Sequence, residues 1–126
     1  MIVRMKTSRE SKERMEALNR VLKFSSNAIL LRYALALSIN YEIDIYNDKL
    51  AEVSNNSGFE INRVTLFGEN ELAYKLMMGV TNSDDDEVFF PHLTNMHIER
   101  GLILLEREYK IAGNKEKLIN NLINRL

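Results

Sequence analysis

The chain has no cysteine, and no run of apolar residues in it approaches the roughly 18 that a membrane span needs. Without cysteine, the protein cannot form disulfides, thiolate metal ligands or a cysteine nucleophile, and it cannot carry sulfur as a persulfide. The first residues also lack the long apolar stretch of a secretion signal. We therefore expect a soluble, cytoplasmic protein in which residues 1–126 form a single domain around one core.

The sequence signatures of common enzymes are missing as well. There is no glycine-rich phosphate loop, serine-hydrolase elbow or dinucleotide-binding fingerprint. The only histidines, His92 and His97, would lie about 140° apart on a helix, which disfavours joint metal binding. A structural polar network of His97 with Glu99 and Arg100 is favoured over acid–base catalysis. The acidic run 84–87 lacks the alternating spacing of a calcium loop and is interpreted as a solvated turn. We expect no enzyme activity, catalytic residue, cofactor or metal site.

Positive charge is concentrated at the start of a chain whose formal net charge is only −1. Residues 1–32 have a charge balance of +5, residues 33–90 of −8 and residues 91–126 of +2. A polyanion responds to local potential and not to net charge, so this near-neutral balance does not exclude nucleic acid. The basic side chains of the first segment are Arg4, Lys6, Arg9, Lys12, Arg14, Arg20, Lys23 and Arg32.

The N-terminal segment predicts a short strand or extended arm followed by a helix. Residues 3–6 alternate apolar and basic side chains, which is the two-residue period of a strand. Thr7 and Glu10 have the spacing of a capping box, so we expect a helix from Ser8 to about Lys23. The apolar stripe expected to face the core consists of Met15, Leu18, Val21 and Leu22.

The segment after Phe24 predicts a second helix of different character. Ser25 or Ser26 can cap it, and it should run from about Asn27 to Asn40. This stretch is apolar almost all round, as expected of a central helix or of a helix in a subunit interface.

The remainder predicts a long loop followed by three further helices. Residues 41–59 contain turn-forming residues and little periodicity, and residues 58–68 have room for one short strand or helical turn. Helices are expected from Glu69 to about Val80, with the Leu72 and Leu76 spacing, then from Pro91 to about Ile111, and finally over residues 115–126. The predicted fold class is mainly α: a compact helical bundle of about five helices with a short N-terminal strand or extended arm.

Four basic residues of the first helix share one face. At 100° per residue, Arg9, Lys12, Arg20 and Lys23 fall within an arc of about 80° that also contains Glu16. Two interpretations stay open from the residues alone: an ordinary solvated helix face with weak charge pairs, or a phosphate-binding surface. Basic residues on the preceding arm favour the second.

Several stretches together are similar to one known family. They are MKTSRESKERMEAL at 5–18, ILLRYALALS at 29–38, GFEIN at 58–62, LFGE at 66–69 and HIERG at 97–101. In this order they resemble the DndE family, the small subunit of the bacterial DNA phosphorothioation (DNA sulfur modification) machinery. The resemblance covers roughly residues 4–105, and the last helix lies outside it.

The resemblance implies a function that the residues alone do not give. Such proteins are helical homotetramers that bind nicked double-stranded DNA. They work with a cysteine desulfurase, a sulfurtransferase subunit and an SMC-like ATPase, and they leave the sulfur chemistry to those partners. On this basis the expected DNA-binding residues are Arg4, Lys6, Arg9, Lys12, Arg20 and Lys23, with Arg32 as a weaker candidate because it lies in an apolar helix.

Two alternatives use the same residues differently. A basic strand followed by two helices is also typical of a ribbon-helix-helix repressor, in which strands from two chains pair and place side chains such as Arg4 and Lys6 in the major groove. The chain from Tyr41 onward is longer than such a module needs. The second alternative is a scaffold subunit that binds only protein.

Overall fold

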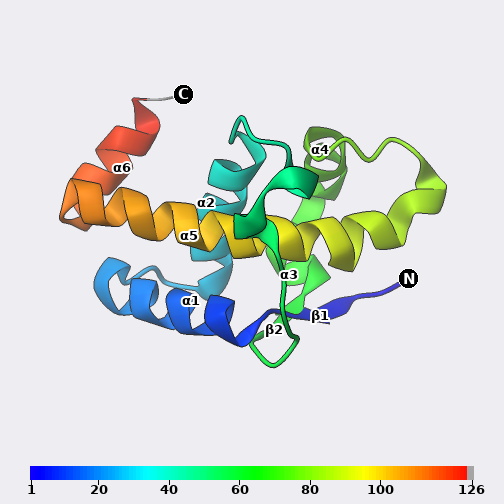
Figure 1. Cartoon of the computed structure of the whole chain (residues 1–126), viewed down its shortest axis with the longest axis horizontal. Helices are drawn as coiled ribbons and strands as arrows, with labels where there is room; N and C mark the ends of the chain where they lie inside the picture. The colour runs from blue at the N-terminus through cyan, green and yellow to red at the C-terminus, as the bar shows by residue number, and fades with distance from the viewer. Residues whose placement is uncertain (125–126) are drawn as a thin grey trace.

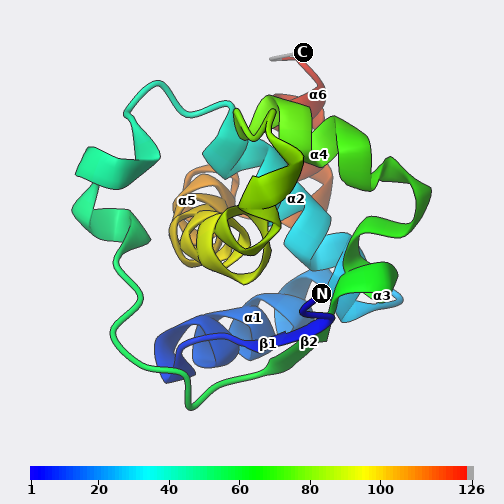
Figure 2. The ribbon, with the colours of Figure 1, turned by 90° about the vertical axis from the view of Figure 1, so that its right-hand side faces the viewer.

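The computed structural model describes residues 1–124 and confirms the mainly α prediction. The helix α5 (Thr94–Ala112) runs along the long axis of the molecule, and the other elements pack around it (Figure 1). Figure 2 looks along α5: α1 (Arg9–Leu22) and a two-stranded sheet lie below it, and α2 (Asn27–Ile39) lies beside it. The sheet pairs β1 (Arg4–Lys6) with β2 (Glu60–Asn62) in antiparallel register.

Short elements fill the rest of the described chain. The segment that was expected to be a long loop contains two 3₁₀ turns, at 45–47 and 49–51. Residues 58–68, expected to hold one short strand or turn, contain both β2 and the short helix α3. The remaining helices are α3 (Arg63–Phe67), α4 (Glu71–Met77) and α6 (Lys115–Ile123).

The start of α1 differs from the predicted capping box by one residue. Ser8, and not Thr7, is the N-cap: its hydroxyl accepts from the Ser11 N–H at 3.0 Å, so the helix begins at Arg9. The Thr7 hydroxyl instead accepts from the Phe59 N–H at 2.9 Å, and thereby ties the end of β1 to the segment before β2. The second cap is as predicted, with Ser26 accepting from the N–H of Ile29 at the start of α2.

The later helices agree with the predicted positions, with adjusted ends. Within Val88–Leu93, Phe90 has extended backbone (φ −134°, ψ 118°), and the helical stretch that continues into α5 starts after it, at Pro91. Gly113 ends α5 with φ 87°, and Asn114 caps α6. The predicted continuation of the last helix to residues 125–126 lies outside the described residues. Among residues 1–124, no helix combines the length and the apolar character that a bilayer span requires.

The centre of the core is the crossing of α2 and α5. Buried leucines of α2, among them Leu30, Leu31 and Leu35, pack there, which makes α2 the central helix that its composition suggested. The two backbones approach very closely at Gly101, where an added Cβ would lie 2.0 Å from the Ala34 carbonyl oxygen. Only glycine fits at this position without moving a helix.

Gly101→Ala is therefore expected to destabilise the protein, although alanine is the better helix former. The methyl group has to displace the backbone of α2, and such overpacking costs about 1–3 kcal/mol against a propensity gain of about 1 kcal/mol. Urea unfolding of the variant measures the difference. Ala112→Gly near the end of α5 provides a control that changes helix propensity without a close approach. A midpoint raised by the propensity gain of about 1 kcal/mol for Gly101→Ala would contradict the close crossing.

Candidate nucleic-acid interface

The strand β1 presents two basic side chains on its outer face. Met5 is buried between Arg4 and Lys6, which are both exposed, because successive strand residues alternate between faces. The register places Asn62 opposite Arg4 and Glu60 opposite Lys6, so one carboxylate shares this face. The outer surface of the sheet is thus basic on β1 and mixed across the pair.

The junction from β1 into α1 is fixed by a second close backbone approach. A Cβ added to Gly58 would lie 2.0 Å from the Ser8 carbonyl oxygen and 2.4 Å from the Thr7 hydroxyl. The Gly58 N–H also donates to the Thr7 carbonyl at 2.9 Å. Gly58 therefore lets the segment before β2 lie directly against the N-cap of α1, so that strand and helix are held in a fixed relation.

The four basic residues that were predicted to share a face of the first helix are all exposed, but only Arg9, Lys12 and Arg20 lie within α1. Lys23 is the C-cap residue and has left-handed backbone (φ 53°), so helical spacing does not place it on the same face. Arg9, Lys12, Arg20 and Lys23 are exposed, while Met15, Leu18 and Leu22 are buried on the core side. Val21, expected in the core stripe, is 46% exposed. With a rise of 1.5 Å per residue, the basic residues are spread over about 21 Å of helix. We call the surface formed by these exposed cations the β1–α1 face. Its members are Arg4, Lys6, Arg9, Lys12, Arg20 and Lys23.

Two of the three acidic residues of α1 contact neighbouring side chains, and the third, Glu13, is exposed. The Glu10 carboxylate accepts two hydrogen bonds from the Asn55 side-chain amide, each at 3.1 Å. Glu16 lies 4.0 Å from the Lys12 ammonium, an exposed pair worth a few tenths of a kcal/mol. Within residues 1–124, the other five cations of the β1–α1 face have no side-chain hydrogen bond or ion pair. They are available to an external anion.

Arg32 differs from the rest of the predicted DNA-binding residues. Its guanidinium donates from Nε to the Leu66 carbonyl and from a terminal nitrogen to the Thr65 carbonyl, both at 2.9 Å. These carbonyls belong to α3, whose end would otherwise leave them without a partner. The structure thus gives Arg32 a role in holding α3 against α2, and we do not include it in the β1–α1 face.

The HIERG stretch of α5 connects three neighbouring elements from the inside of the molecule. Glu99 accepts from the Ser8 hydroxyl at 2.6 Å and lies 3.5 Å from Arg14, so it fastens the start of α1. Arg100 is only 1% exposed; it donates to the Ser38 carbonyl at 2.6 Å and lies 3.3 Å from the Asp48 carboxylate. With Gly101 at the α2 crossing, these residues position the helices that carry the basic face.

His97 is buried and neutral in this network. The Ser38 hydroxyl oxygen accepts from the Arg100 Nε–H at 2.9 Å and shares a hydrogen bond of 2.7 Å with His97 Nδ1, so the three side chains form one continuous chain. Burial, with a smaller contribution from the positive charge of Arg100, lowers the pKa of His97 to about 4. The predicted structural role of His97 agrees with this arrangement, but Glu99, which was expected in the same network, contacts Ser8 and Arg14 instead.

We expect this histidine to make the fold sensitive to mild acid. The unfolded chain takes up a proton at His97 near pH 6.5, whereas the folded chain resists protonation until about pH 4. The free energy of unfolding is thus expected to fall by about 3 kcal/mol as the pH is lowered from 6.5 to about 4. Urea unfolding at pH 7, 6, 5 and 4 measures it. His97→Gln is expected to flatten the curve in this window, and an identical pH dependence in that variant would contradict the assignment.

A second buried arginine was missed in the sequence. Arg63 is 2% exposed, forms an ion pair with Glu71 and donates to Asp86 at 2.6 Å, with Lys75 at 3.3 Å from the same Asp86 carboxylate. The hydrogen bond from Arg63 holds the pKa of Asp86 down to about 2 and also lowers the pKa of Glu71. The interpretation of 84–87 as a purely solvated turn was therefore wrong at Asp86. The sequence did contain one sign of this network, because Arg63 is the one arginine among the acidic residues 33–90.

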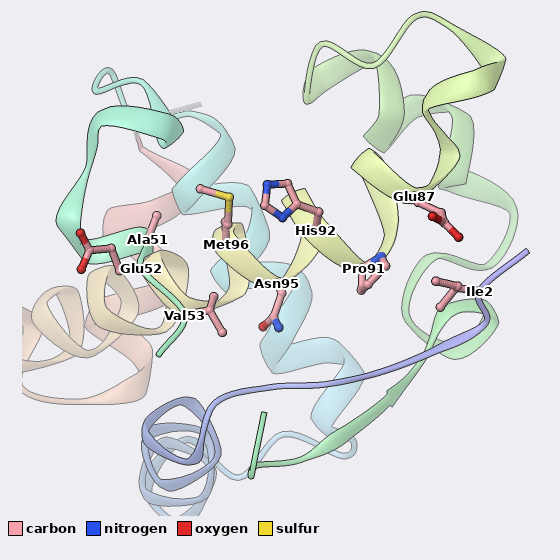
Figure 3. A pocket seen from close by; sticks show the side chains of 9 residues that line it. All are labelled: Ile2, Ala51, Glu52, Val53, Glu87, Pro91, His92, Asn95 and Met96. Atoms are coloured by element: carbon pink, nitrogen blue, oxygen red, sulfur yellow. The ribbon is translucent and has the colours of Figure 1, made fainter. Parts of the chain in front are cut away.

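A pocket of about 560 Å³ lies beside the start of α5 (Figure 3). Its walls include Ile2, Val53 and Met96, and the carboxylates of Glu52 and Glu87 lie on opposite sides of it. Within residues 1–124, no group of three or more histidine or carboxylate side chains is arranged to hold a metal ion. His92 also lines the pocket, but its side chain does not form such a metal-binding group with the two carboxylates.

The pairing of β1 bears on the ribbon-helix-helix alternative. A repressor of that kind forms its DNA-reading sheet from the same strand of two chains. Here β1 pairs with β2 of its own chain, and the Lys6 carbonyl on the other edge accepts from the Asn95 side-chain amide at 3.1 Å. Both edges of β1 are therefore engaged inside the chain, which disfavours an intermolecular ribbon.

Comparison with known proteins gives a consistent result. The sequence model of the family described as "DndE: DNA sulphur modification protein DndE" matches residues 4–113. Curated protein sequences give no match. The fold is similar to a crystal structure of DndE from Escherichia coli B7A, described as involved in DNA phosphorothioation modification. The two share 18% sequence identity with a TM-score of 0.61, over 81% of this chain and 96% of that chain. At this identity the structural likeness shows a shared fold.

Proposed function

Because the family match spans residues 4–113, the chain belongs to the DndE family of DNA sulphur modification proteins, and we propose that it is the non-catalytic DNA-binding subunit of a DNA phosphorothioation complex. The resemblance noted in the sequence is thereby confirmed at the level of the family. The observation that carries the proposal is the β1–α1 face: six exposed cations on adjoining elements, of which five have no internal side-chain partner within residues 1–124.

Binding through such a face follows from the electrostatic attraction between its cations and the phosphate backbone of DNA. Exposed lysines and arginines without internal partners replace condensed counterions on duplex phosphates, which gives affinity without reading base sequence. The spread of about 21 Å along α1 is enough to span several phosphates of one strand. We propose that intact and nicked duplexes are both bound, and that binding depends steeply on salt concentration.

We further propose that the sulfur chemistry belongs to other subunits of the complex. The chain has no cysteine with which to accept or pass on sulfur. Its proposed partners are a sulfurtransferase and an SMC-like ATPase, and its proposed state is a cytoplasmic homo-oligomer, a tetramer by the family resemblance. In an oligomer, several copies of a modest basic face add up to a larger DNA-binding surface.

The direct test is a fluorescence anisotropy titration of the protein with nicked and intact duplexes of the same sequence at several salt concentrations. We expect binding to both at low salt and a similar affinity for unrelated sequences. Absence of binding at low salt, with the partner subunits also present, would refute the proposal. Sequence-selective protection of a palindrome would instead favour a repressor.

A cellular assay separates a DNA-binding subunit from a protein-only scaffold. If the β1–α1 face contacts DNA, substituting its cations abolishes phosphorothioate in genomic DNA while the subunit still co-purifies with its partners. Normal phosphorothioate content in that variant would show that the subunit acts as a scaffold.

A further inference from the structure

A short polar loop lies against the start of α1. Its residues, 54–57, have the sequence Ser-Asn-Asn-Ser and contain no charged side chain, although they belong to the acidic segment 33–90. Ser54, Asn56 and Ser57 are exposed, whereas Asn55 is partly buried. In Figures 1 and 2 the loop lies at the lower edge of the molecule, below the junction of β1 and α1 and on the side away from α5. We call these four residues the 54–57 loop.

Asn55 anchors the loop to α1. Its side-chain oxygen accepts from the Arg9 N–H at 2.8 Å and from the Ser57 N–H at 3.1 Å. Its amide nitrogen donates to both carboxylate oxygens of Glu10, each at 3.1 Å, and to the Ser54 hydroxyl at 3.2 Å. One amide group therefore binds both ends of the loop and the first turn of α1.

The segment that follows the loop is fixed as well. The Gly58 N–H donates to the Thr7 carbonyl at 2.9 Å, and the Phe59 N–H donates to the Thr7 hydroxyl at 2.9 Å. Together with Asn55, these bonds hold the loop in one conformation beside the β1–α1 junction. A segment that is already ordered loses little conformational freedom on binding, so its contacts with a ligand cost less entropy.

The anchored loop leaves two polar side chains on the outside. Within residues 1–124, the Asn56 amide and the Ser57 hydroxyl have no hydrogen-bond partner. Both groups are donors, and asparagine and serine side chains commonly donate to phosphate oxygens in protein–DNA complexes. Arg9, an exposed cation of the β1–α1 face, lies next to them because its backbone N–H binds Asn55.

The surroundings of the loop carry both signs of charge. The neighbouring cations are Lys6 at the end of β1 and Arg9 at the start of α1. The neighbouring carboxylates are Glu10, which is held by Asn55, and Glu60, which is opposite Lys6 in the sheet. The loop therefore adds neutral donors, and not further positive charge, to this part of the surface.

We propose that the 54–57 loop is part of the DNA interface, with the Asn56 amide and the Ser57 hydroxyl donating to phosphate oxygens beside the phosphate that Arg9 binds. Asn55 is the positioning residue that holds both donors at the start of α1. This role rests on the proposed DNA-binding function and extends the β1–α1 face from charged to neutral contacts. Neutral phosphate contacts fix the register of the backbone on the protein without reading base sequence.

The salt dependence of binding distinguishes neutral contacts from charged ones. A neutral donor adds affinity but releases no counterion, so its removal leaves the slope of log K against log salt unchanged. Asn56→Ala with Ser57→Ala is expected to weaken duplex binding about tenfold at every salt concentration, because two neutral hydrogen bonds are lost. Fluorescence anisotropy with the full chain measures both quantities.

The matched control removes the same two residue types elsewhere. Asn70→Ala with Ser83→Ala changes an exposed asparagine before α4 and an exposed serine in the acidic turn, and it is expected to leave the affinity unchanged. Circular dichroism checks the fold of each variant. Asn56→Ala alone, with about a threefold loss of affinity, replaces the loop variant if that one is not folded.

A charge-neutral exchange tests the positioning role of Asn55. Asn55→Asp places a second carboxylate against Glu10, which is expected to displace the loop and to weaken binding more than tenfold. Adding Glu10→Gln to this variant exchanges donor and acceptor between the two positions and restores the net charge of the wild type. We expect the double variant to recover the wild-type affinity. An affinity that stays low would overturn the role of Asn55.

The outcomes separate the loop from the cations. Wild-type affinity in Asn56→Ala with Ser57→Ala, or a shallower salt slope in that variant, would overturn the neutral contacts. The cations of the β1–α1 face would be unaffected by that result, since glutamine substitutions test them separately. Absence of binding by the wild type at low salt would overturn the loop contacts and the proposed DNA binding together.

Discussion

Replacing Arg100 by methionine is expected to lower the free energy of unfolding by about 3–5 kcal/mol. The guanidinium is 1% exposed and donates to the Ser38 hydroxyl, to the Ser38 and Ile43 carbonyls and to Asp48. Methionine fills much of the space but leaves the Asp48 carboxylate and two carbonyls in the interior without their donor. The loss is large against a typical stability of 5–15 kcal/mol for a domain, roughly a third of it.

Two control variants separate the network from a general effect of charge. Arg107→Met changes the same residue type on the same helix at an exposed position, and it should stay within about 0.5 kcal/mol of the wild type. Arg100→Lys keeps the charge but not the planar set of donors, so an intermediate loss is expected. The measurement is the midpoint and slope of urea unfolding. A loss below about 1 kcal/mol for Arg100→Met would show that the network contributes little.

Neutralising four cations of the β1–α1 face is expected to weaken duplex binding by about three orders of magnitude at 0.1 M salt. Each phosphate contact contributes about 0.9 to the slope of log K against log salt, so four contacts are worth about 3.6 decades relative to 1 M salt. The variant carries glutamine at Arg9, Lys12, Arg20 and Lys23. The fold should be unaffected because all four side chains are exposed. Fluorescence anisotropy measures the affinity.

A smaller pair of variants controls for net charge. Arg20→Gln with Lys23→Gln removes two charges from the face, and Lys49→Gln with Lys117→Gln removes two exposed charges from elsewhere. The first pair is expected to weaken binding by more than tenfold and the second only slightly. Equal losses in the two pairs would mean that overall charge, and not the β1–α1 face, governs binding.

The sequence was sufficient to predict the longer helices and, apart from Val21, the core-facing stripe of α1. Local signals specify these features: the apolar stripe of α1, the serine before α2 and the proline at position 91 each act within a few residues. The same locality explains why Arg9, Lys12 and Arg20 could be placed on one face in advance, since their arrangement depends only on helix geometry. Lys23 falls outside that geometry, because α1 ends at Leu22 and Lys23 has left-handed backbone.

What escaped prediction depends on contacts between distant parts of the chain. Ser8, and not Thr7, caps α1 because Thr7 is engaged by Phe59 across the sheet. Arg63 is buried although it begins the short helix α3. Its ion-pair partners come from α4 and from the acidic turn. No periodicity in the sequence encodes such pairings, because they depend on tertiary packing.

The outward orientation of the apolar side of α4, where Leu72 and Leu76 are exposed, is the clearest case. Leu72 and Leu76 have the spacing of a core-facing stripe, and a local pattern cannot tell an inward from an outward apolar face. The ion pairs of Glu71 with Arg63 and of Lys75 with Asp86, together with the packing of Tyr74 and Met78 against the core, set the rotation. In the same way, the HIERG residues were recognisable as a motif, but their roles depend on tertiary packing. Glu99 binds the start of α1, and Gly101 allows the close approach of α2.

The central claim is that the β1–α1 face contacts duplex phosphates, and the salt dependence of binding tests it most directly. The slope of log K against log salt counts the contacts, and it does so independently of protein concentration errors. The account predicts that glutamine at Arg9, Lys12, Arg20 and Lys23 makes this slope shallower by about 3.6 for each DNA-bound chain. A slope equal to that of the wild type would contradict the claim, since the four residues would then release no counterions.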